Sequence, residues 1–182
     1  MRRVQLFYKD MSEIVGSNGF AVVRLVDLEE QRAICVICDK SMVEQLMIRF
    51  NRMPGRQLML PEVLLQMIQR GGFCDMELTV NDIIDGQYQV SLLNKATATM
   101  VPIRMSDAIL LHYISKIPIY IDADLMLRQS TPYQSEARGI SIPINTLDTE
   151  NLKRQLERAI ETEDYHLASF LHEELQKRNV QQ

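Results

Sequence analysis

The sequence contains no tryptophan, only three cysteines and no long uninterrupted apolar run. A membrane-spanning helix needs roughly 18 or more consecutive apolar residues, so no such helix is expected. Met1 to Arg3 lead at once into alternating polar and apolar residues, which are not the apolar core of a signal peptide. We therefore expect a cytoplasmic protein that does not enter the membrane. Eleven methionines predict a core filled partly by flexible side chains.

An excess of positive charge is also missing. The 182 residues include 20 Lys and Arg against 24 Asp and Glu, and the formal net charge is −4. This balance argues against a globally basic nucleic-acid binder and leaves room for a local basic patch. A chain of this length buries enough surface to form a core without a disulfide or a structural metal.

The cysteines Cys35, Cys38 and Cys74 cannot all pair, which suits a reducing compartment. Cys35 and Cys38 form a C-x-x-C pattern inside the apolar run from Ala33 to Cys38. Positions three apart on a strand point to opposite faces, so the two sulfurs would not ligate one ion. We expect small buried side chains rather than a zinc site.

The chain reads as two similar halves followed by a tail. Residues 4–9, 20–26 and 32–38 have strand patterns, and a helix follows in which Ser41 and Glu44 have capping-box spacing. Pro61 suits the first turn of a second helix with a predicted buried stripe at Val63, Leu64, Met67 and Ile68.

The second half has the same order of elements. Alternation of apolar and polar residues from Cys74 to Asn81 predicts a strand with one solvent-exposed face. Asp85-Gly86 predicts a turn into a strand over 87–93. A strand over 99–104 leads to a helix that Ser106 would cap, and a short strand over 118–122 follows. The shared order over 3–50 and 74–115 hints at internal duplication. We predict an α+β fold with largely antiparallel sheets, flanking helices and a C-terminal α-helical hairpin.

The tail begins with a segment of different composition. Residues 128–148 mix Ser, Thr, Gln, Pro and Gly without periodicity and are interpreted as a linker. Two apolar stripes then predict a helical hairpin over 149–178, within a C-terminal unit of residues 149–182. A hairpin this small must dock on the main domain, on a second copy or on another protein. We expect self-association, most simply as a dimer, or a protein partner bound through 149–178.

Two motifs resemble known families. The segment Arg104-Met105-Ser106-Asp107-Ala108-Ile109, followed by Pro118-Ile119-Tyr120, resembles the signature of the bifunctional nuclease family of bacterial and plant proteins. This resemblance covers residues 1–127 and implies DNase and RNase activity. The tail is similar to the UVR motif of excision-repair proteins, which is a protein-docking element. Its matching residues are Leu152, Lys153, Leu156, Ala159, Ile160, Glu163, Asp164, Tyr165, Ala168, Leu171, Glu173, Glu174, Lys177 and Arg178.

The nuclease resemblance indicates where chemistry would reside. Phosphodiester hydrolysis needs an activated water and stabilisation of the phosphoryl charge. The candidate catalytic residues are Glu62, Arg104, Ser106 and Asp107, and the candidate nucleic-acid contacts are Arg49, Arg52 and Arg56. An active member would use a divalent metal such as Mg²⁺, and the sequence does not assign its ligands.

Structural roles compete with these functional ones. Arg104 and Asp107 could instead form an ion pair at a helix start, and the short Asp122-x-Asp124 spacing fits a helix cap better than a cation site. Leu60 and Pro61 occupy the positions where the family has His and Asp, and neither can titrate. We therefore expect either a nuclease of DNA or RNA with reduced activity or a non-catalytic interaction module that docks through its hairpin.

Overall fold

The N-terminal strands form the antiparallel meander that their alternation predicts. The computed structural model describes residues 2–14, 19–71, 75–133 and 149–180. Strand β1 (Arg3–Glu13) pairs with β2 (Ala21–Val26), and β2 pairs with β3 (Arg32–Cys38). Helix α1 (Lys40–Phe50) follows β3 directly.

The second half repeats this order. Strands β4 (Met76–Ile84), β5 (Gln87–Asn94) and β6 (Thr99–Arg104) are again an antiparallel meander, and helix α3 (Met105–Ser115) follows. The first strand of each half has a register irregularity at a similar place, between Tyr8 and Asp10 in β1 and between Val80 and Asp82 in β4. The likeness of the halves therefore includes a local irregularity as well as the order of elements.

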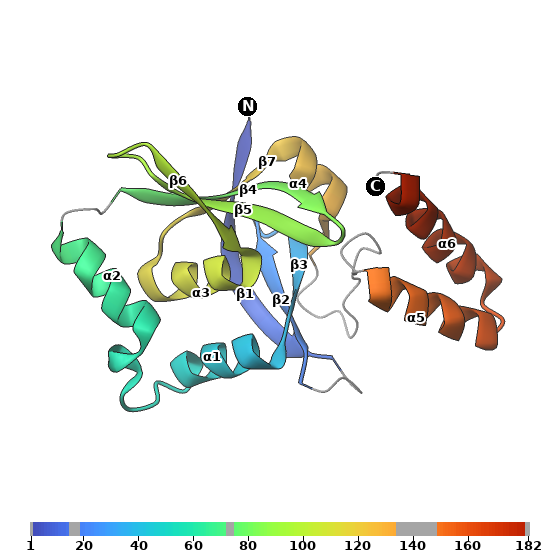
Figure 1. Ribbon diagram of the computed structural model, residues 1–182, viewed down its shortest axis with the longest axis horizontal. Helices are drawn as coiled ribbons and strands as arrows, with labels where there is room; N and C mark the ends of the chain where they lie inside the picture. Colours follow the sequence, from blue (N-terminus) through green and yellow to red (C-terminus); the bar gives the residue numbers. More distant parts are fainter. Residues whose placement is uncertain (1, 15–18, 72–74, 134–148, 181–182) are drawn as a thin grey trace.

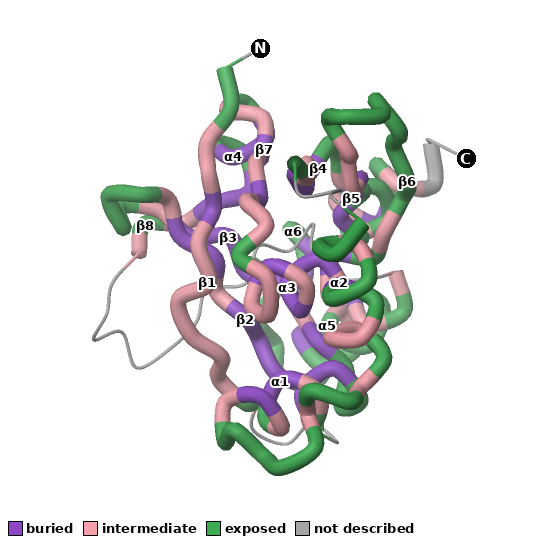
Figure 2. The backbone as a smooth tube through the Cα atoms, turned by 90° about the vertical axis from the view of Figure 1, so that its left-hand side faces the viewer, coloured by how far each residue is buried: buried purple, intermediate pink, exposed green. Residues whose placement is uncertain are grey.

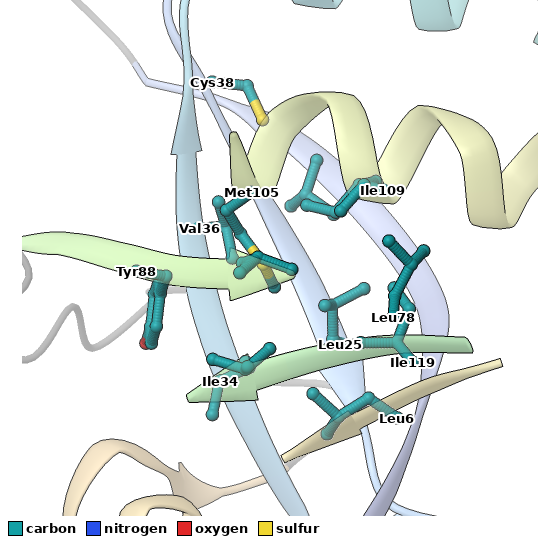
Figure 3. Packing of buried hydrophobic residues seen from close by; sticks show 14 of the residues in the cluster. Leu6, Leu25, Ile34, Val36, Cys38, Leu78, Tyr88, Met105, Ile109 and Ile119 are labelled. Atoms are coloured by element: carbon teal, nitrogen blue, oxygen red, sulfur yellow. The ribbon is translucent and has the colours of Figure 1, made fainter. Parts of the chain in front are cut away.

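A short strand, β7 (Ile119–Asp122), joins the two halves into one mixed sheet. It runs parallel to β4 and antiparallel to β1, which gives the order β6-β5-β4-β7-β1-β2-β3-β8. Ile119 pairs with Leu6 on one side and with Leu78 on the other, and all three side chains are fully buried (Figure 3). These central strands therefore form the core of an α+β fold in which most strand pairs are antiparallel.

Regular structure continues into the segment predicted as a linker. Helix α4 (Ala123–Gln129) is capped by Asp122, whose side chain accepts hydrogen bonds from the N–H groups of Asp124 and Leu125. Strand β8 (Thr131–Pro132) then pairs with the start of β3. The prediction of a linker from residue 128 is therefore wrong for residues 128–132, because local capping and strand pairing stabilise a segment without periodicity. Residues 134–148 lie outside the described residues.

Both predicted serine caps are wrong. Asp39 caps α1 by accepting a hydrogen bond from the N–H of Met42, and Arg104 is in the cap position of α3 without a side-chain capping hydrogen bond. Ser41 and Ser106 lie inside the first helical turns. A cap needs extended backbone just before the helix, which Asp39 and Arg104 have.

Two predicted faces also differ from the structure. A 3₁₀ turn η1 (Arg56–Leu58) precedes helix α2 (Leu60–Arg70), which contacts α3 at the periphery of the fold (Figure 1). Of the four residues predicted to be buried, Leu64 and Met67 are exposed, at 48% and 66%, and Val63 and Ile68 are of intermediate burial. Most of the helix is green or pink in Figure 2. The prediction of a solvent-exposed face on β4 is wrong at Glu77, because this side chain is buried beside Arg3 and Lys95.

The tail forms the expected hairpin of α5 (Thr149–Glu161) and α6 (Tyr165–Val180). Its apolar stripes bury Leu152 and Leu171 between the two helices and pack against Ile37 of β3. Asp85 in the β4–β5 turn accepts hydrogen bonds from Thr149 at 2.5 Å and from Arg178 at 3.2 Å. Of the three expected docking partners, the main domain is the one that the structure shows. None of the helices in the described residues is long and apolar enough to span a bilayer.

Candidate functional site

A pocket of about 530 Å³ lies where the sheet curls and brings β3 close to β5 and β6. Figure 3 shows β5 crossing β3, with Tyr88 beside Ile34 and Val36. The starts of α1 and α3 border the same pocket through Asp39 and Ser106. The polar and charged side chains in its lining are Asp39, Gln87, Tyr88, Gln89, Arg104, Ser106 and Asn151.

The start of α3 contributes the positive end of the pocket. No side chain caps this helix, so N–H groups of its first turn are not used by a capping side chain. Arg104 precedes the helix, and its side chain is 74% exposed. An arginine and open helical N–H groups together favour an anion such as a phosphate. Ser106 adds a hydroxyl at the same place.

Asp107 holds the guanidinium of Arg104 in place. Nε of Arg104 donates to Oδ2 of Asp107 at 2.7 Å, and Nη2 donates to Oδ1 at 3.2 Å. This two-point contact fixes the plane of the guanidinium and raises the pKa of Arg104. Arg104, Ser106 and Asp107 are thus together, as their adjacency predicts, and Asp107 has the ion-pairing role.

Asp39 is a pocket residue that the sequence analysis did not identify. It is exposed, it lines the pocket with Arg104, and it makes a further, smaller contribution to the raised pKa of Arg104 after the dominant one from Asp107. The only signal in the sequence is its place between a strand and a helix. Nothing in the sequence indicates that positions 39 and 104 meet, because the curl of the sheet brings them together.

Tyr88 contributes a polar group from the core side of the pocket. Tyr88 is 7% exposed, and its hydroxyl has no hydrogen-bond partner among the described residues. Burial raises the pKa of Tyr88 far above its ordinary value, so the hydroxyl stays protonated at neutral pH. An unsatisfied buried hydroxyl is costly, and a bound polar group within reach would relieve that cost.

The other predicted site residues lie elsewhere. Glu62 of α2 and Arg49 of α1 form an ion pair with each other at 2.7 Å, and Arg49 is 5% exposed. Burial keeps Arg49 from the surface contact with nucleic acid that the sequence suggested. Arg52 and Arg56 follow α1, outside the pocket lining. Leu60 and Pro61 begin α2, also outside the lining, so their departure from the family pattern removes no group from the pocket.

Metal-binding chemistry has few donors in the structure. The described residues contain no group of three or more His, Cys, Asp or Glu side chains placed to hold an ion. Both carboxylate oxygens of Asp107 already accept from Arg104, and Oδ1 of Asp39 accepts from the N–H of Met42. These two carboxylates therefore do not form a prebuilt metal site.

Among the described cysteines and histidines, Cys35, Cys38 and His112 are buried. Cys35 and Cys38 are buried in β3, as predicted, and burial raises the pKa of both thiols, that of Cys38 to about 12. His112 is buried in α3 with Nδ1 2.8 Å from the carbonyl oxygen of Ile117, and burial lowers its pKa. His166 and His172 are exposed on the hairpin.

Comparison with known proteins identifies most of the main domain. The family model of the bifunctional nuclease domain matches residues 23–134. No curated protein matches the chain in sequence. The matched range includes every pocket residue on β3, β5, β6 and α3, and it omits only Phe20 and Asn151 from the lining.

Proposed function

Because the chain belongs to the bifunctional nuclease domain family, we propose that it hydrolyses phosphodiester bonds of DNA or RNA in the pocket at the start of α3. The observation that carries this proposal is the position of Arg104 and Ser106 at an uncapped helix N-terminus bordering that pocket. The positive end of the pocket suits the charge of a phosphodiester.

Four residues have a defined part in the proposed reaction: Asp39, Arg104, Ser106 and Asp107. Arg104 and the N–H groups of the first turn of α3 bind the phosphoryl oxygens, whose negative charge grows in the transition state. Asp107 positions the guanidinium of Arg104 and does not contact substrate. Ser106 donates a hydrogen bond to a phosphoryl oxygen.

Asp39 is the proposed proton acceptor, because its carboxylate lines the pocket that Arg104 and Ser106 also line. In the proposed step, a water oxygen forms a bond to phosphorus as its proton passes to the Asp39 carboxylate. The bond from phosphorus to the leaving oxygen breaks, and that oxygen takes a proton from solvent. The described residues offer no prebuilt donor set for a divalent cation, so Mg²⁺ would be held mainly by phosphate oxygens of the substrate and would offset their negative charge.

A cleavage assay tests the proposal. Labelled single-stranded DNA and RNA are incubated with the purified full chain, with and without Mg²⁺, and product is compared for wild type and Asp39→Asn. We expect cleavage by wild type and its loss in the variant, because a general base typically contributes about 10²- to 10⁴-fold. Arg128→Gln is the matched control, since Arg128 is exposed on α4 away from the pocket lining. Equal cleavage by wild type and Asp39→Asn would contradict the assignment of the base.

A further inference from the structure

Helix α2 presents an apolar surface to solvent, although amphipathic helices normally bury such a surface. Leu60, Leu64 and Met67 recur at helical spacing and are 69%, 48% and 66% exposed. Met53 and Leu58, in the preceding segment, are 49% and 78% exposed. These five residues are called the α2 surface below. Contiguous exposed apolar side chains of this kind mark interaction sites.

The α2 surface is flanked by positive charge. Arg52, Arg56 and Arg70 lie around it, and no ion pair links any of them to another described residue. The one acidic residue of residues 51–71, Glu62, is already paired with Arg49. The α2 surface therefore combines an apolar centre with three uncompensated positive charges.

The opposite end of the molecule has a complementary surface. The turn between α5 and α6 and the adjoining helix ends expose Ile160, Tyr165 and Phe170, at 55%, 69% and 52%. The acidic side chains around them are exposed and comprise Glu157, Glu161, Glu163 and Asp164, against the single base Arg158. This set is called the hairpin tip below. Glu157 and Glu161 are four residues apart on one helix, where like charges destabilise each other until a cation is near.

We propose that the α2 surface binds the hairpin tip of a second copy of this chain. Each surface carries exposed apolar side chains, and the charges beside them are opposite in sign. Figure 1 shows α2 and the hairpin at opposite ends of the long axis, so the two surfaces of one chain do not reach each other. A pair of copies has two surfaces of each kind, and a closed two-fold dimer would satisfy all four.

Other occupants fit the α2 surface less well. Pairing α2 with α2 of a second copy would bring the arginines of both copies together. A nucleic acid would suit the arginines, but the leucines and methionines offer no aromatic ring on which a base could stack. The hairpin tip matches both the charge and the apolar character, and every copy of the chain supplies it.

Two variants with reversed charges, one at each surface, test whether the α2 surface pairs with the hairpin tip. One variant carries Arg52→Glu, Arg56→Glu and Arg70→Glu, which makes both of its surfaces acidic. A second variant carries Glu157→Arg, Glu161→Arg and Glu163→Arg, which makes both of its surfaces basic. Light scattering over a concentration series should show a dimer for wild type and monomers for each variant alone. An equimolar mixture of the two variants should restore the dimer, because each acidic surface then meets a basic one.

Single apolar changes give a second, independent readout. Leu64→Ser and Tyr165→Ser should each raise the dimer dissociation constant by about tenfold or more, as central interface residues do. Leu28→Ser is the matched control, since Leu28 is 78% exposed in the β2–β3 turn and should leave the constant unchanged. Circular dichroism of each variant checks that the fold is kept.

Several results would overturn the inference. Monomeric wild type at high concentration would do so, and so would a dimer that both charge-reversed variants keep. A dimer lost only on reversal at α2 would exclude the hairpin tip as the occupant. Binding of the wild-type monomer to vesicles of anionic lipid, abolished by reversal at α2, would assign the surface to a membrane instead.

Discussion

The Arg49 guanidinium donates to the Glu62 carboxylate across 2.7 Å, with 3% of the Arg49 side chain and 12% of the Glu62 side chain exposed. Arg49 also donates to the carbonyl oxygen and the side-chain oxygen of Gln45. The pair joins α1 to α2, so two residues that look like site residues in the sequence instead hold two helices together.

Glu62→Gln should lower the free energy of unfolding by about 3–5 kcal/mol, because it leaves the buried guanidinium without a counter-charge. Urea denaturation at neutral pH measures the change. The double variant Arg49→Met with Glu62→Leu should lose less, since it removes both charges and keeps apolar volume. A loss below about 1 kcal/mol in the single variant would show that the pair behaves as an exposed one.

The sequence predicted the strands well, because alternation of side chains depends on local neighbours. The turn at Asp85-Gly86 was predictable for the same reason, and both residues have the positive φ that this turn needs. The buried ion pair of Arg49 and Glu62 was not predictable, since the sequence does not show whether a charged helical residue is solvated or paired. Asp39 and Arg104 line the same pocket only because the eight-stranded sheet curls, and no local sequence pattern predicts that curl.

The exposed stripe of α2 shows a different limit. Periodicity identifies a helix with an apolar side, and the usual inference is that this side faces the core. In this chain Leu64 and Met67 are apolar and exposed. Sequence reasoning therefore predicts the helix correctly and wrongly places Leu64 and Met67 in the core.

Stability should fall in acid partly through Glu77. Burial alone would raise the pKa of Glu77, but hydrogen bonds from Arg3 and Lys95 outweigh it and lower the pKa below its ordinary value near 4.5. A carboxyl with a lowered folded-state pKa stabilises the fold above its unfolded pKa, and this contribution is lost as pH falls through the folded value.

Urea unfolding of wild type and Glu77→Gln should therefore differ most at neutral pH and converge below about pH 4.5. Asp75→Asn is a control for the same region, since Asp75 also pairs with Lys95 and is largely exposed. A difference between wild type and Glu77→Gln that is constant from pH 7 to the acid limit would show that the charge of Glu77 is not responsible.

Native Cys35 and Cys38 should react slowly with a thiol reagent at pH 8. Burial raises the pKa of both thiols, that of Cys38 to about 12, so little reactive thiolate is present. Mass spectrometry of labelled peptides from a Cys74→Ser background measures each rate, and the same protein in denaturant provides the fast reference. Fast labelling of Cys38 in the native protein would contradict its burial.

The Asp85 contacts should control how firmly the hairpin docks. Asp85→Asn removes the charge that pairs with Arg178 and should increase hydrogen exchange in α5 and α6 more than in the central strands. Glu150→Gln is the matched control, because it breaks the exposed Glu150–Arg154 pair within α5 and leaves Asp85 intact. Equal exchange in Asp85→Asn and wild type would mean that Ile37 and the other apolar contacts suffice.

Asp107→Asn should weaken the proposed reaction without unfolding the protein. The variant loses the ionic part of the contact that orients Arg104, whose side chain is mostly exposed, so the cost in stability should be at most about 1 kcal/mol. Turnover and melting temperature of the same preparation separate the two effects. A lower melting temperature with unchanged turnover would leave Asp107 as a helix-start residue only.

Substitution of Arg104 tests most directly whether the pocket at the start of α3 cleaves a phosphodiester. The measurement is kcat/KM for cleavage of a labelled single-stranded oligonucleotide by wild type and Arg104→Gln, with Arg104→Lys as the charge-conserving variant. We expect kcat/KM to drop by about 10²- to 10³-fold for Arg104→Gln and by less for Arg104→Lys, with unchanged folding in both. Cleavage at the wild-type rate by a correctly folded Arg104→Gln protein would contradict the claim.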